Sequence, residues 1–475
     1  MRARSLADVA RLMRPDVVAV QGSAEVVGPD VVIDNRLATP GSLFVAIPGE
    51  RVDGHDFAAA AVSAGAAAVL ATRDTGAETA HLLVDDSVTG LSWLARGLVA
   101  EARTRGMASI GITGSSGKTS TKDLLAQVLE AAGPTVAPEG SQNNEIGVPL
   151  TACRVDDRTR FLVSEMGARG VGHIAWLTSL VGLDVGVVLN VGHAHVGEFG
   201  GIEQTALAKG EIVADLEAGG WAVLNGNDAA VVPMRDRTRA RLAWFGEGDL
   251  PGGDLHVRAR DVVINALGQP AFHLEVTRDG VATVAPVQLG VVGRHQVSNA
   301  LAAAAAAIVV GLDPDQVATA LSGAVRRSRW RMELTERADG VLVLNDAYNA
   351  NPDSMAAALR TTADLVQSRR AEHPGSRALA VLGDMLELGS LATDAHARLG
   401  RLTADLSISE VVAVGEFAGT IAAAARAAGV SARVARRDDV ASSLALAPGD
   451  VVLVKGSRGV GLERVAAQLL ESEVV

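Results

Sequence analysis

The residues best suited to chemistry lie in the stretch Gly111-Ile-Thr-Gly-Ser-Ser-Gly-Lys-Thr-Ser-Thr121. Its glycines would let backbone N–H groups turn inward around an anion, and a helix starting here would add its positive end. The ammonium of Lys118 could reach the outer phosphates of a nucleotide, and the hydroxyl of Thr119 could bind Mg²⁺. The stretch therefore predicts a phosphate-binding loop made by Gly114, Ser115, Ser116, Gly117, Lys118, Thr119 and Ser120.

The predicted loop departs from the standard phosphate-loop motif at one position. That motif has a glycine with four residues between it and the Gly-Lys pair, but this chain has Ile112 there. The neighbouring sequence still favours a phosphate loop over a plain Gly-Ser turn. Ile110 and Ile112 indicate a short strand before the loop, and apolar residues at helical spacing follow it.

Lysine is rare in this chain, and its few positions are informative. Of 43 Lys and Arg residues only four are lysines, at Lys118, Lys122, Lys209 and Lys455. A compact ammonium suits a phosphate cradle, so a chain rich in arginine is expected to keep lysine where arginine would not serve. Lys209 and Lys455 therefore become candidate site residues, and Lys122 is expected to lie incidentally on its helix face. Chance survival of a few lysines is the alternative.

Several polar residues follow predicted strands, at the edge where open α/β sheets bind ligands. Glu165 ends one strand and His195 follows another, so both are candidate ligands of a hard metal beside a nucleotide. A hydrogen-bonding role is the alternative for His195. Asn143 and Asn144 lie together in a loop bounded by glycines and offer several donors and acceptors.

Four further candidates lie later in the chain. His295 and Asn299 are four residues apart and share one helical face, so they could hold a purine ring or simply cap the helix. Tyr348, the only tyrosine, lies in a loop after a predicted strand, and Lys455 ends another strand.

The elements that must position these residues alternate between strands and helices. This order predicts an α/β protein of three domains: an α/β unit at 1–86, a parallel sheet with the phosphate loop at 87–326, and a doubly wound, Rossmann-like domain at 327–475. Polar loops of the first unit could hold a second ligand. Strands are predicted within 31–36, 39–49, 67–70, 161–167, 185–191, 221–225, 255–284, 341–344, 379–385, 411–415 and 451–458, and helices within 54–65, 87–105, 206–212, 300–310 and 354–367.

Composition excludes several classes of protein. The net charge of −12 argues against a general nucleic-acid binder. One cysteine, Cys153, excludes a disulfide framework and indicates a reducing compartment, so we expect a cytoplasmic protein. The segment Ser5-Leu-Ala-Asp8 is typical of a helix start rather than a signal peptide. No apolar run reaches the roughly 18 residues that a membrane span needs.

Together these motifs resemble those of the Mur ligases of peptidoglycan synthesis, over nearly the whole chain. Two positions depart from the family's pattern: Asn35 stands where a UDP-sugar loop usually has Ser or Thr, and Gln296 stands where Asn usually lies beside the adenine. The motifs that carry the resemblance are Gly114-Ser-Ser-Gly-Lys-Thr119, Asn143-Asn-Glu-Ile-Gly-Val-Pro149, Lys209-Gly-Glu-Ile212, Tyr348-Asn-Ala-Asn-Pro352, Gly383-Asp-Met385 and Lys455-Gly-Ser-Arg458.

The resemblance implies an ATP-dependent, ADP-forming amide ligase of the bacterial cytoplasm, expected to be a monomer. ATP would phosphorylate the terminal carboxylate of UDP-N-acetylmuramoyl-tripeptide, and the amine of D-alanyl-D-alanine would attack the acyl phosphate. The domain at 1–86 would bind the UDP-muramoyl substrate, 87–326 ATP, and 327–475 would complete the ligase site. The sequence does not fix the third residue of the tripeptide, lysine or diaminopimelate.

The resemblance also implies roles for single residues. Lys118 would contact the outer phosphates, Thr119 and Glu165 one Mg²⁺, and His195 with a carbamate on Lys209 a second Mg²⁺. The resemblance also places four residues around the nucleotide: His295, Asn299, Arg331 and Asp346. The implied substrate-binding residues are Asp34, Asn35, Arg36, His55, Asn143, Asn144, Tyr348, Asn349, Lys455 and Ser457.

Two other functions remain as alternatives. Another amide ligase of the superfamily, of a different muramoyl-peptide or folylpolyglutamate type, would share the ATP loop. The folylpolyglutamate type would lack the long N-terminal segment and the Tyr348–Pro352 motif. A nucleotide-switched binding module such as a GTPase would need an Asn/Thr-Lys-x-Asp guanine motif, which this chain does not contain.

Overall fold

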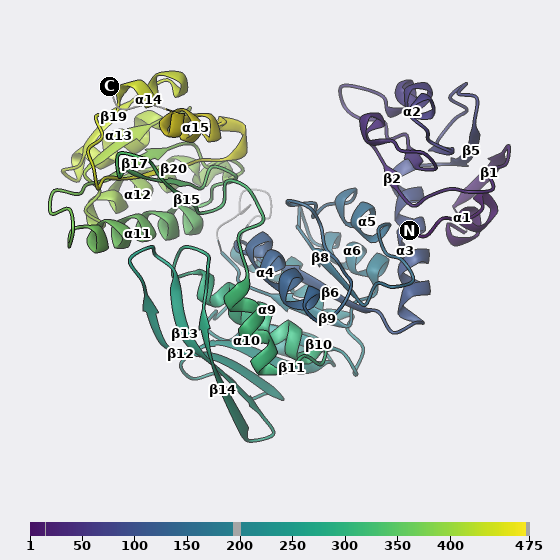
Figure 1. The fold of residues 1–475 in the computed structure, drawn as a ribbon, viewed down its shortest axis with the longest axis horizontal. Helices are drawn as coiled ribbons and strands as arrows, with labels where there is room; N and C mark the ends of the chain where they lie inside the picture. The colour runs from purple at the N-terminus through teal and green to yellow at the C-terminus, as the bar shows by residue number, and fades with distance from the viewer. Residues whose placement is uncertain (15, 193–200, 472–475) are drawn as a thin grey trace.

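Three separate sheets organise the chain. The computed structural model describes residues 1–14, 16–192 and 201–471. Figure 1 shows three lobes, with the N-terminal part (purple) and the C-terminal part (yellow-green) on opposite sides of a central lobe. The α/β class, the parallel sheet of the central lobe and the doubly wound C-terminal lobe are confirmed. The exact domain boundaries at 86 and 326 stay predictions.

The first lobe is built on a five-stranded sheet in the order β1-β5-β4-β3-β2. Ser5 caps the first helix, because its hydroxyl accepts a hydrogen bond from the Asp8 N–H at 3.2 Å, as the sequence predicts. The sequence analysis missed β1 and β5, which pair antiparallel and close one edge of the sheet. The elements are α1 (Leu6–Leu12), β1 (Val17–Gln21), β2 (Val31–Val32), β3 (Leu43–Val45), α2 (Ala58–Ser63), β4 (Ala68–Ala71) and β5 (Ala80–Val84), with 3₁₀ turns at Asn35–Leu37 and Gly54–Phe57.

A long helix, α3 (Ser87–Arg103), leads from the first lobe into the central one. The central sheet has nine strands in the order β14-β13-β12-β11-β10-β9-β6-β8-β7. Its strands are parallel from β7 to β12, and β12, β13 and β14 form an antiparallel meander within and just beyond the predicted strand region 255–284. The strands are β6 (Ala108–Thr113), β7 (Thr135–Val136), β8 (Phe161–Glu165), β9 (Val185–Val188), β10 (Trp221–Asn225), β11 (Arg241–Glu247), β12 (Leu255–Ile264), β13 (Pro270–Arg278) and β14 (Val281–Gln288).

Two helices of the central lobe pack closely because one of them is rich in alanine. The side chains of Ala302–Ala307 in α9 are 0% exposed, so their small size lets α9 lie between α4 and the sheet. The helix predicted within 300–310 is confirmed. The helices of this lobe are α4 (Lys118–Glu130), α5 (Gly147–Ala152), α6 (His173–Val181), α8 (Ile202–Ala214), α9 (Gln296–Val309) and α10 (Pro314–Gly323), with a 3₁₀ turn at Val232–Arg237.

The third lobe has apolar cores on both faces of its sheet. Its strands run in the order β15-β16-β20-β17-β18-β19, all parallel except β15. Along β16, Leu342 and Leu344 join one core while Val341 and Val343 join the other, as expected of a strand covered on both sides. The elements are β15 (Glu333–Glu336), β16 (Leu342–Asn345), α11 (Pro352–Arg369), β17 (Ala378–Leu382), α12 (Ala392–Asp405), β18 (Glu410–Ala413), α13 (Ala418–Ala427), β19 (Ser431–Val434), α14 (Val440–Ser443), β20 (Val451–Lys455) and α15 (Glu463–Glu471), with 3₁₀ turns at Gly389–Leu391, Arg437–Asp439 and Arg458–Val460.

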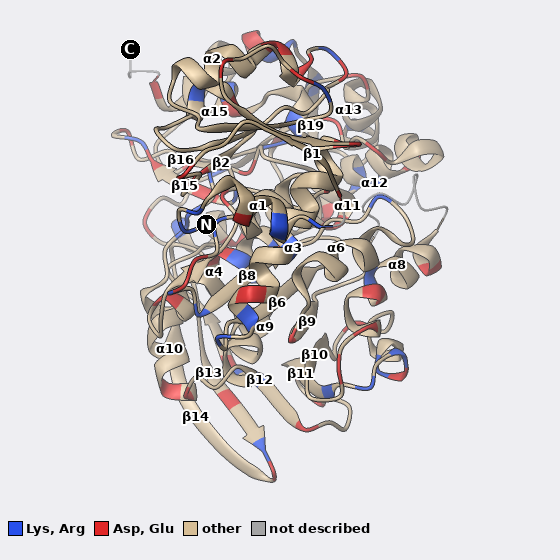
Figure 2. Ribbon diagram, turned by 90° about the vertical axis from the view of Figure 1, so that its right-hand side faces the viewer, with Lys and Arg blue, Asp and Glu red and all other residues tan. Residues whose placement is uncertain are grey.

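Charged residues are spread over the ribbon. In the view of Figure 2, acidic and basic positions lie scattered among one another over the ribbon. Within the described part of the chain, no helix has the length and apolarity that a membrane crossing requires.

Candidate active site

The phosphate loop lies at the carboxyl edge of the central sheet. β6 pairs with β8 and β9, and Ile112 and Thr113 lie opposite Glu165 and Val188. The ends of these three strands therefore meet at one edge. Gly117, just before α4, has φ +82°, and a Cβ there would lie 2.4 Å from the Asn299 Oδ1 atom. Only glycine fits this position without displacing Asn299.

Lys118 lies across its own loop. Its Nζ donates to the Gly114 carbonyl at 2.7 Å. Its side chain is partly exposed and lines a cavity between the central and third lobes. Burial lowers the pKa of Lys118, and the nearby Arg331 guanidinium lowers it further, against the opposing charge of Glu165. The amine is thus held near both the loop backbone and a carboxylate.

Two hydroxyls and a carboxylate form an oxygen cluster beside Lys118. The Thr119 hydroxyl donates to Glu165 Oε2 at 2.9 Å, and the Ser141 hydroxyl lies 3.0 Å from the Thr119 hydroxyl. The Asn143 amide donates to Glu165 Oε1 at 2.8 Å. Such hard oxygens suit Mg²⁺, which commonly takes one or two carboxylates together with phosphates and waters. Within residues 1–14, 16–192 and 201–471, no group of three or more His, Cys, Asp and Glu side chains gathers as a metal cage.

Lys209 is buried in α8, with 2% of its surface exposed, and it lines the same cavity. Burial lowers the pKa of Lys209 well below its usual range, and Lys118 lowers it further. Glu211 accepts hydrogen bonds from the N–H groups of Gly172 and Ala175, at 2.6 and 3.0 Å. Lys209 is therefore a buried residue and not a surface lysine of α8. His195, its predicted companion at a second metal, lies outside the described residues.

Lys122 is not an incidental surface residue, contrary to the sequence-based expectation. Its side chain is 3% exposed, pairs with Asp123 and donates to the Pro138 carbonyl at 3.0 Å. The sequence around Lys122 could not show this burial, because Pro138, which accepts its hydrogen bond, lies in a later segment of the chain. Lys122 thus ties α4 to the loop that leads to Ser141.

Residues of the third lobe reach across to the phosphate loop. The Arg331 guanidinium donates to the Ser141 hydroxyl at 2.7 Å and lies 4.1 Å from the centre of the Tyr348 ring. The Asn351 amide donates to the Ser115 carbonyl at 3.4 Å. The site is therefore shared between the central and third lobes.

Lys455 holds the loop that carries these residues. Its buried Nζ donates to Asp346 Oδ2 at 2.5 Å and to the Asn349 carbonyl at 2.9 Å. Burial lowers the pKa of His295, with Lys455 lowering and Asp346 raising it. The Lys455 amine is already hydrogen-bonded within its own lobe. Its contact with substrate stays a prediction.

A cavity of about 800 Å³ opens between the two lobes and brings most predicted residues together. Gly114 takes part through its carbonyl oxygen, described above. The predicted residues that line the cavity are Ser115, Ser116, Gly117, Lys118, Thr119, Ser120, Asn143, Asn144, Glu165, Lys209, His295, Asn299, Arg331, Asp346, Tyr348, Asn349, Lys455 and Ser457.

The predicted residues of the first lobe lie apart from this cavity. Asp34 forms a two-point ion pair with Arg36, and this pair is exposed at the surface beside Asn35. His55 is 4% exposed, and both ring nitrogens are engaged: Nδ1 with Asp53 at 2.6 Å and Nε2 with the Thr72 N–H at 3.1 Å. A substrate contact of His55 would require the ring to give up one of these bonds.

The sequence analysis missed two residues that shape the phosphate loop. Asn190 exchanges hydrogen bonds with the Ser116 backbone, accepting from its N–H at 2.9 Å and donating to its carbonyl at 3.2 Å. Ser141 bridges Thr119 and Arg331. The rule that pointed to Glu165 could have found Asn190, since both follow a strand at the same sheet edge.

These features define a nucleotide-binding enzyme whose active site is shared by two α/β domains. Comparison with known proteins goes further. Models of three Mur ligase domains match the chain: the Mur ligase family catalytic domain at 30–96, the middle domain at 112–307 and the glutamate ligase domain at 330–458. The chain belongs to the Mur ligase family, and the resemblance seen in the sequence is confirmed.

Relatives of known name align over nearly the full length. The UDP-N-acetylmuramoyl-tripeptide--D-alanyl-D-alanine ligase of Mycobacterium leprae is 42% identical, over 96% of this chain and 95% of its own. The ligase of the same name from Escherichia coli is 33% identical, over 95% and 96%. A crystal structure of MurF from Acinetobacter baumannii, at 27% identity, superposes with a TM-score of 0.84 over 99% of this chain and 100% of its own. MurF from Thermotoga maritima in complex with ADP superposes with a TM-score of 0.74, at 27% identity, over 93% and 97%.

Proposed function

We infer that this protein is an ATP-dependent, ADP-forming ligase that joins D-alanyl-D-alanine to UDP-N-acetylmuramoyl-tripeptide in peptidoglycan precursor synthesis. Relatives of that name align from end to end at up to 42% identity. The structural observation that carries the proposal is the shared site, in which Arg331 of the third lobe bonds Ser141 beside the phosphate loop. The product would be UDP-N-acetylmuramoyl-pentapeptide.

The reaction divides a difficult amide bond formation into two easier steps. A carboxylate oxygen of the tripeptide attacks the γ-phosphorus of ATP, and ADP leaves. The amine of D-alanyl-D-alanine then attacks the acyl carbon, loses a proton and expels phosphate, which is a better leaving group than hydroxide. In both steps the protein mainly positions its substrates and stabilises charge.

The residues around the phosphate loop have chemistry suited to the first step. We propose that Lys118 binds the outer phosphate oxygens, which would replace the Gly114 carbonyl as the acceptor of its amine. Arg331 would approach the same oxygens from the third lobe. Thr119 and Glu165 would hold Mg²⁺, which neutralises phosphate charge when bound. A second Mg²⁺ would use His195 and a carbamate on Lys209.

The adenine and ribose have candidate partners farther along the cavity. Asn299 lies against Gly117 and donates to the buried Gln296 side chain at 2.8 Å. Burial keeps the pKa of His295 below its usual value, so its ring would be neutral and could pack against a purine. Asp346 would accept from the ribose hydroxyls.

The two other substrates would approach from different sides. The exposed Asp34–Arg36 turn of the first lobe is proposed to bind the UDP portion of the muramoyl substrate. Asn143 and Asn144 would contact its peptide, while Tyr348 and Asn349 would contact D-alanyl-D-alanine. A cytoplasmic, monomeric enzyme is proposed with this function, since its substrates are cytoplasmic nucleotides and dipeptides.

The function is tested by measuring ADP and phosphate release with purified protein. Release is expected only when ATP, UDP-N-acetylmuramoyl-tripeptide and D-alanyl-D-alanine are all present, and mass spectrometry should show the pentapeptide product. Tripeptides ending in lysine and in diaminopimelate would be compared. Equal turnover with a folate substrate and glutamate, or with a single amino acid in place of the dipeptide, would favour another ligase of the superfamily.

The third lobe is expected to move toward the other two during the reaction. Substrate-binding residues are spread over all three lobes, whose outer two lie apart in Figure 1. A hinge within Arg326–Ser328 would let the third lobe close over bound nucleotide. The radius of gyration from small-angle X-ray scattering should fall when a non-hydrolysable ATP analogue and the tripeptide substrate bind together. An unchanged radius, with both ligands shown to be bound by calorimetry, would contradict this motion.

A further inference from the structure

Three polar residues lie on one face of the helix that follows the phosphate loop. Asp123, Gln127 and Glu130 are spaced four and three residues apart along α4, so their side chains lie above one another. The same helix begins with Lys118 and Thr119 at the phosphate loop. Any shift of α4 on nucleotide binding therefore moves these three side chains as well.

All three side chains bind the segment that connects the central and third lobes. This linker, residues 325–328, lies far from α4 in the sequence. Gln127 bonds the Val325 backbone twice, donating to its carbonyl at 2.9 Å and accepting from its N–H at 3.0 Å. Glu130 pairs with Arg327 through two bonds, at 2.7 and 2.5 Å. Asp123 accepts from the Ser328 N–H at 3.1 Å.

The contact with Asp123 is the buried centre of this group. Asp123 is 7% exposed and Ser328 is 8% exposed, whereas the Glu130 and Arg327 side chains are 40% and 43% exposed. An exposed ion pair contributes little stability, because water screens its charges. Lys122 fixes the Asp123 carboxylate from the other side. Gln127 and Glu130 are therefore the contacts that can be removed without disturbing this buried charge pair.

The linker leads directly to Arg331. Trp330 and Met332, on either side of it, have φ values of +56° and +48°, a backbone region that side chains disfavour. Hydrogen bonds hold this turn: the Met332 N–H donates to Asp346 at 3.0 Å. The turn aims the guanidinium at Ser141, and the buried Arg331 Nε has no hydrogen-bond partner among the described residues. A ligand oxygen would satisfy that group.

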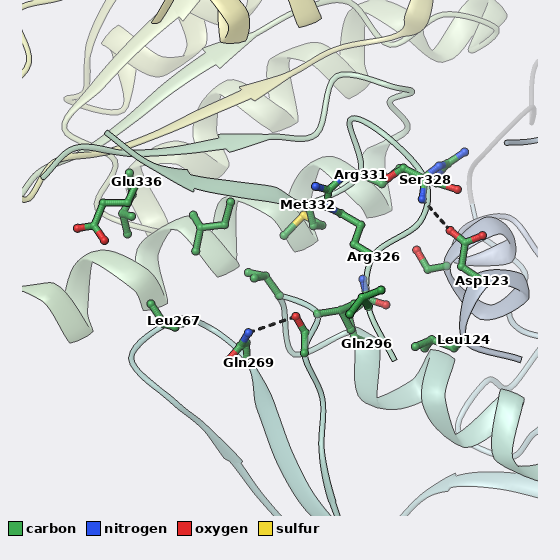
Figure 3. Close-up of a pocket in the computed structure, with 17 residues that line it drawn as sticks. Asp123, Leu124, Leu267, Gln269, Gln296, Arg326, Ser328, Arg331, Met332 and Glu336 are labelled. Carbon is green, nitrogen blue, oxygen red and sulfur yellow. Dashed lines mark hydrogen bonds between the residues drawn. The ribbon is translucent and has the colours of Figure 1, made fainter. Parts of the chain in front are cut away.

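A cavity lies against the linker, beside α4. This space of about 250 Å³ lies between α4, the β12–β13 turn and β15–β16 (Figure 3). Figure 3 shows Arg326 and Met332 at its margin, and the Asp123–Ser328 bond at one end. Packing therefore leaves part of the linker uncovered, and the hydrogen bonds to α4 help to hold it in place.

We propose that Asp123, Gln127 and Glu130 are positioning residues that couple nucleotide binding at the phosphate loop to the placement of Arg331. Nucleotide orders the start of α4, α4 holds the linker, and the linker sets the turn that aims Arg331 into the site. This inference rests on the proposed function at one point: phosphoryl transfer is the step that correct placement of Arg331 would assist.

Hydrogen exchange tests this coupling without any ligase chemistry. In the wild type, a non-hydrolysable ATP analogue should slow amide exchange in peptides covering 325–334 by about tenfold or more, within the range usual for coupled sites. The double variant Gln127→Ala/Glu130→Ala keeps the phosphate loop intact. It should bind the analogue with unchanged affinity and lose the protection of these peptides. Full protection in this variant would overturn the proposal, as would loss of analogue binding.

Turnover gives a second, independent reading. The double variant should show a kcat lowered about tenfold, with the KM for ATP changed less than about threefold. The charge reversal Glu130→Arg/Arg327→Glu should recover part of the protection and rate that Glu130→Arg alone loses. Asp394→Ala, which removes an exposed ion pair of α12, is the matched control. It should change neither the exchange protection of the linker peptides nor kcat. A Glu130→Arg variant that is as active as the Glu130→Arg/Arg327→Glu variant would count against the coupling. A wild type that lacks turnover would refute the ligase function, while the exchange result would still decide the coupling.

Discussion

Replacing Lys118 by alanine should lower kcat about a thousandfold or more and leave the protein folded. Among the residues that the structure describes, Lys118 donates only to the Gly114 carbonyl, so the fold loses one exchangeable hydrogen bond. In the transition state the same amine would face developing charge on the transferred phosphoryl group. Removing one such preorganised contact costs several kcal/mol.

Steady-state rates and a thermal unfolding curve check this prediction together. The melting temperature of Lys118→Ala should stay within a few degrees of the wild type. Activity above a tenth of the wild-type rate would exclude the proposed role of Lys118. Loss of activity together with a collapsed melting transition would instead show that Lys118 supports the fold.

Replacing Lys209 by arginine should abolish turnover, although it keeps the positive charge. Lys209 is 2% exposed in the cavity beside the phosphate loop. An ammonium there would be repelled by Mg²⁺. Its neutral amine can instead attack the carbon of CO₂ and lose a proton, giving an anionic carbamate whose oxygens suit Mg²⁺. Arginine stays protonated and cannot form this group.

Carbon-13 NMR in labelled bicarbonate detects the carbamate directly. The wild type should give a carbamate signal that is lost in Lys209→Ala. Lys122→Arg serves as the control, because it removes another buried lysine of the same lobe and should keep the signal. A fully active Lys209→Arg enzyme would rule out the carbamate, and a signal that persists in Lys209→Ala would place the carbamate elsewhere.

Features set by neighbouring residues could be predicted from the sequence. The phosphate loop and Glu165 were found because a strand, a turn and a helix follow one another within a short stretch. The parallel strands of the third lobe were found because both of their faces are buried, which gives continuous apolar runs. Strand β15 was missed because it is partly exposed and has no such run, whereas β1 and β11 contain successive apolar residues and could have been predicted.

Features made by distant segments could not be predicted in this way. The role of Lys122 depends on the carbonyl of Pro138, and that of Ser141 depends on Arg331, which lies 190 residues away. The linker contacts of α4 join residues about 200 positions apart. No local pattern marks Gln127 or Glu130, which read as ordinary polar positions of a helix.

The burial of lysine has a practical consequence for covalent labelling. Lys122, Lys209 and Lys455 are each at most 3% exposed, and Lys118, which lines the nucleotide cavity together with Lys209 and Lys455, is the one partly exposed lysine of the four. Reagents that acylate lysine amines would find almost no exposed lysine on the protein surface and one reactive lysine inside the pocket. Its lowered pKa makes that group more nucleophilic near neutral pH. An activated ester attached to a nucleotide analogue would thus mark the occupied pocket at a single lysine, and competing ATP would protect it.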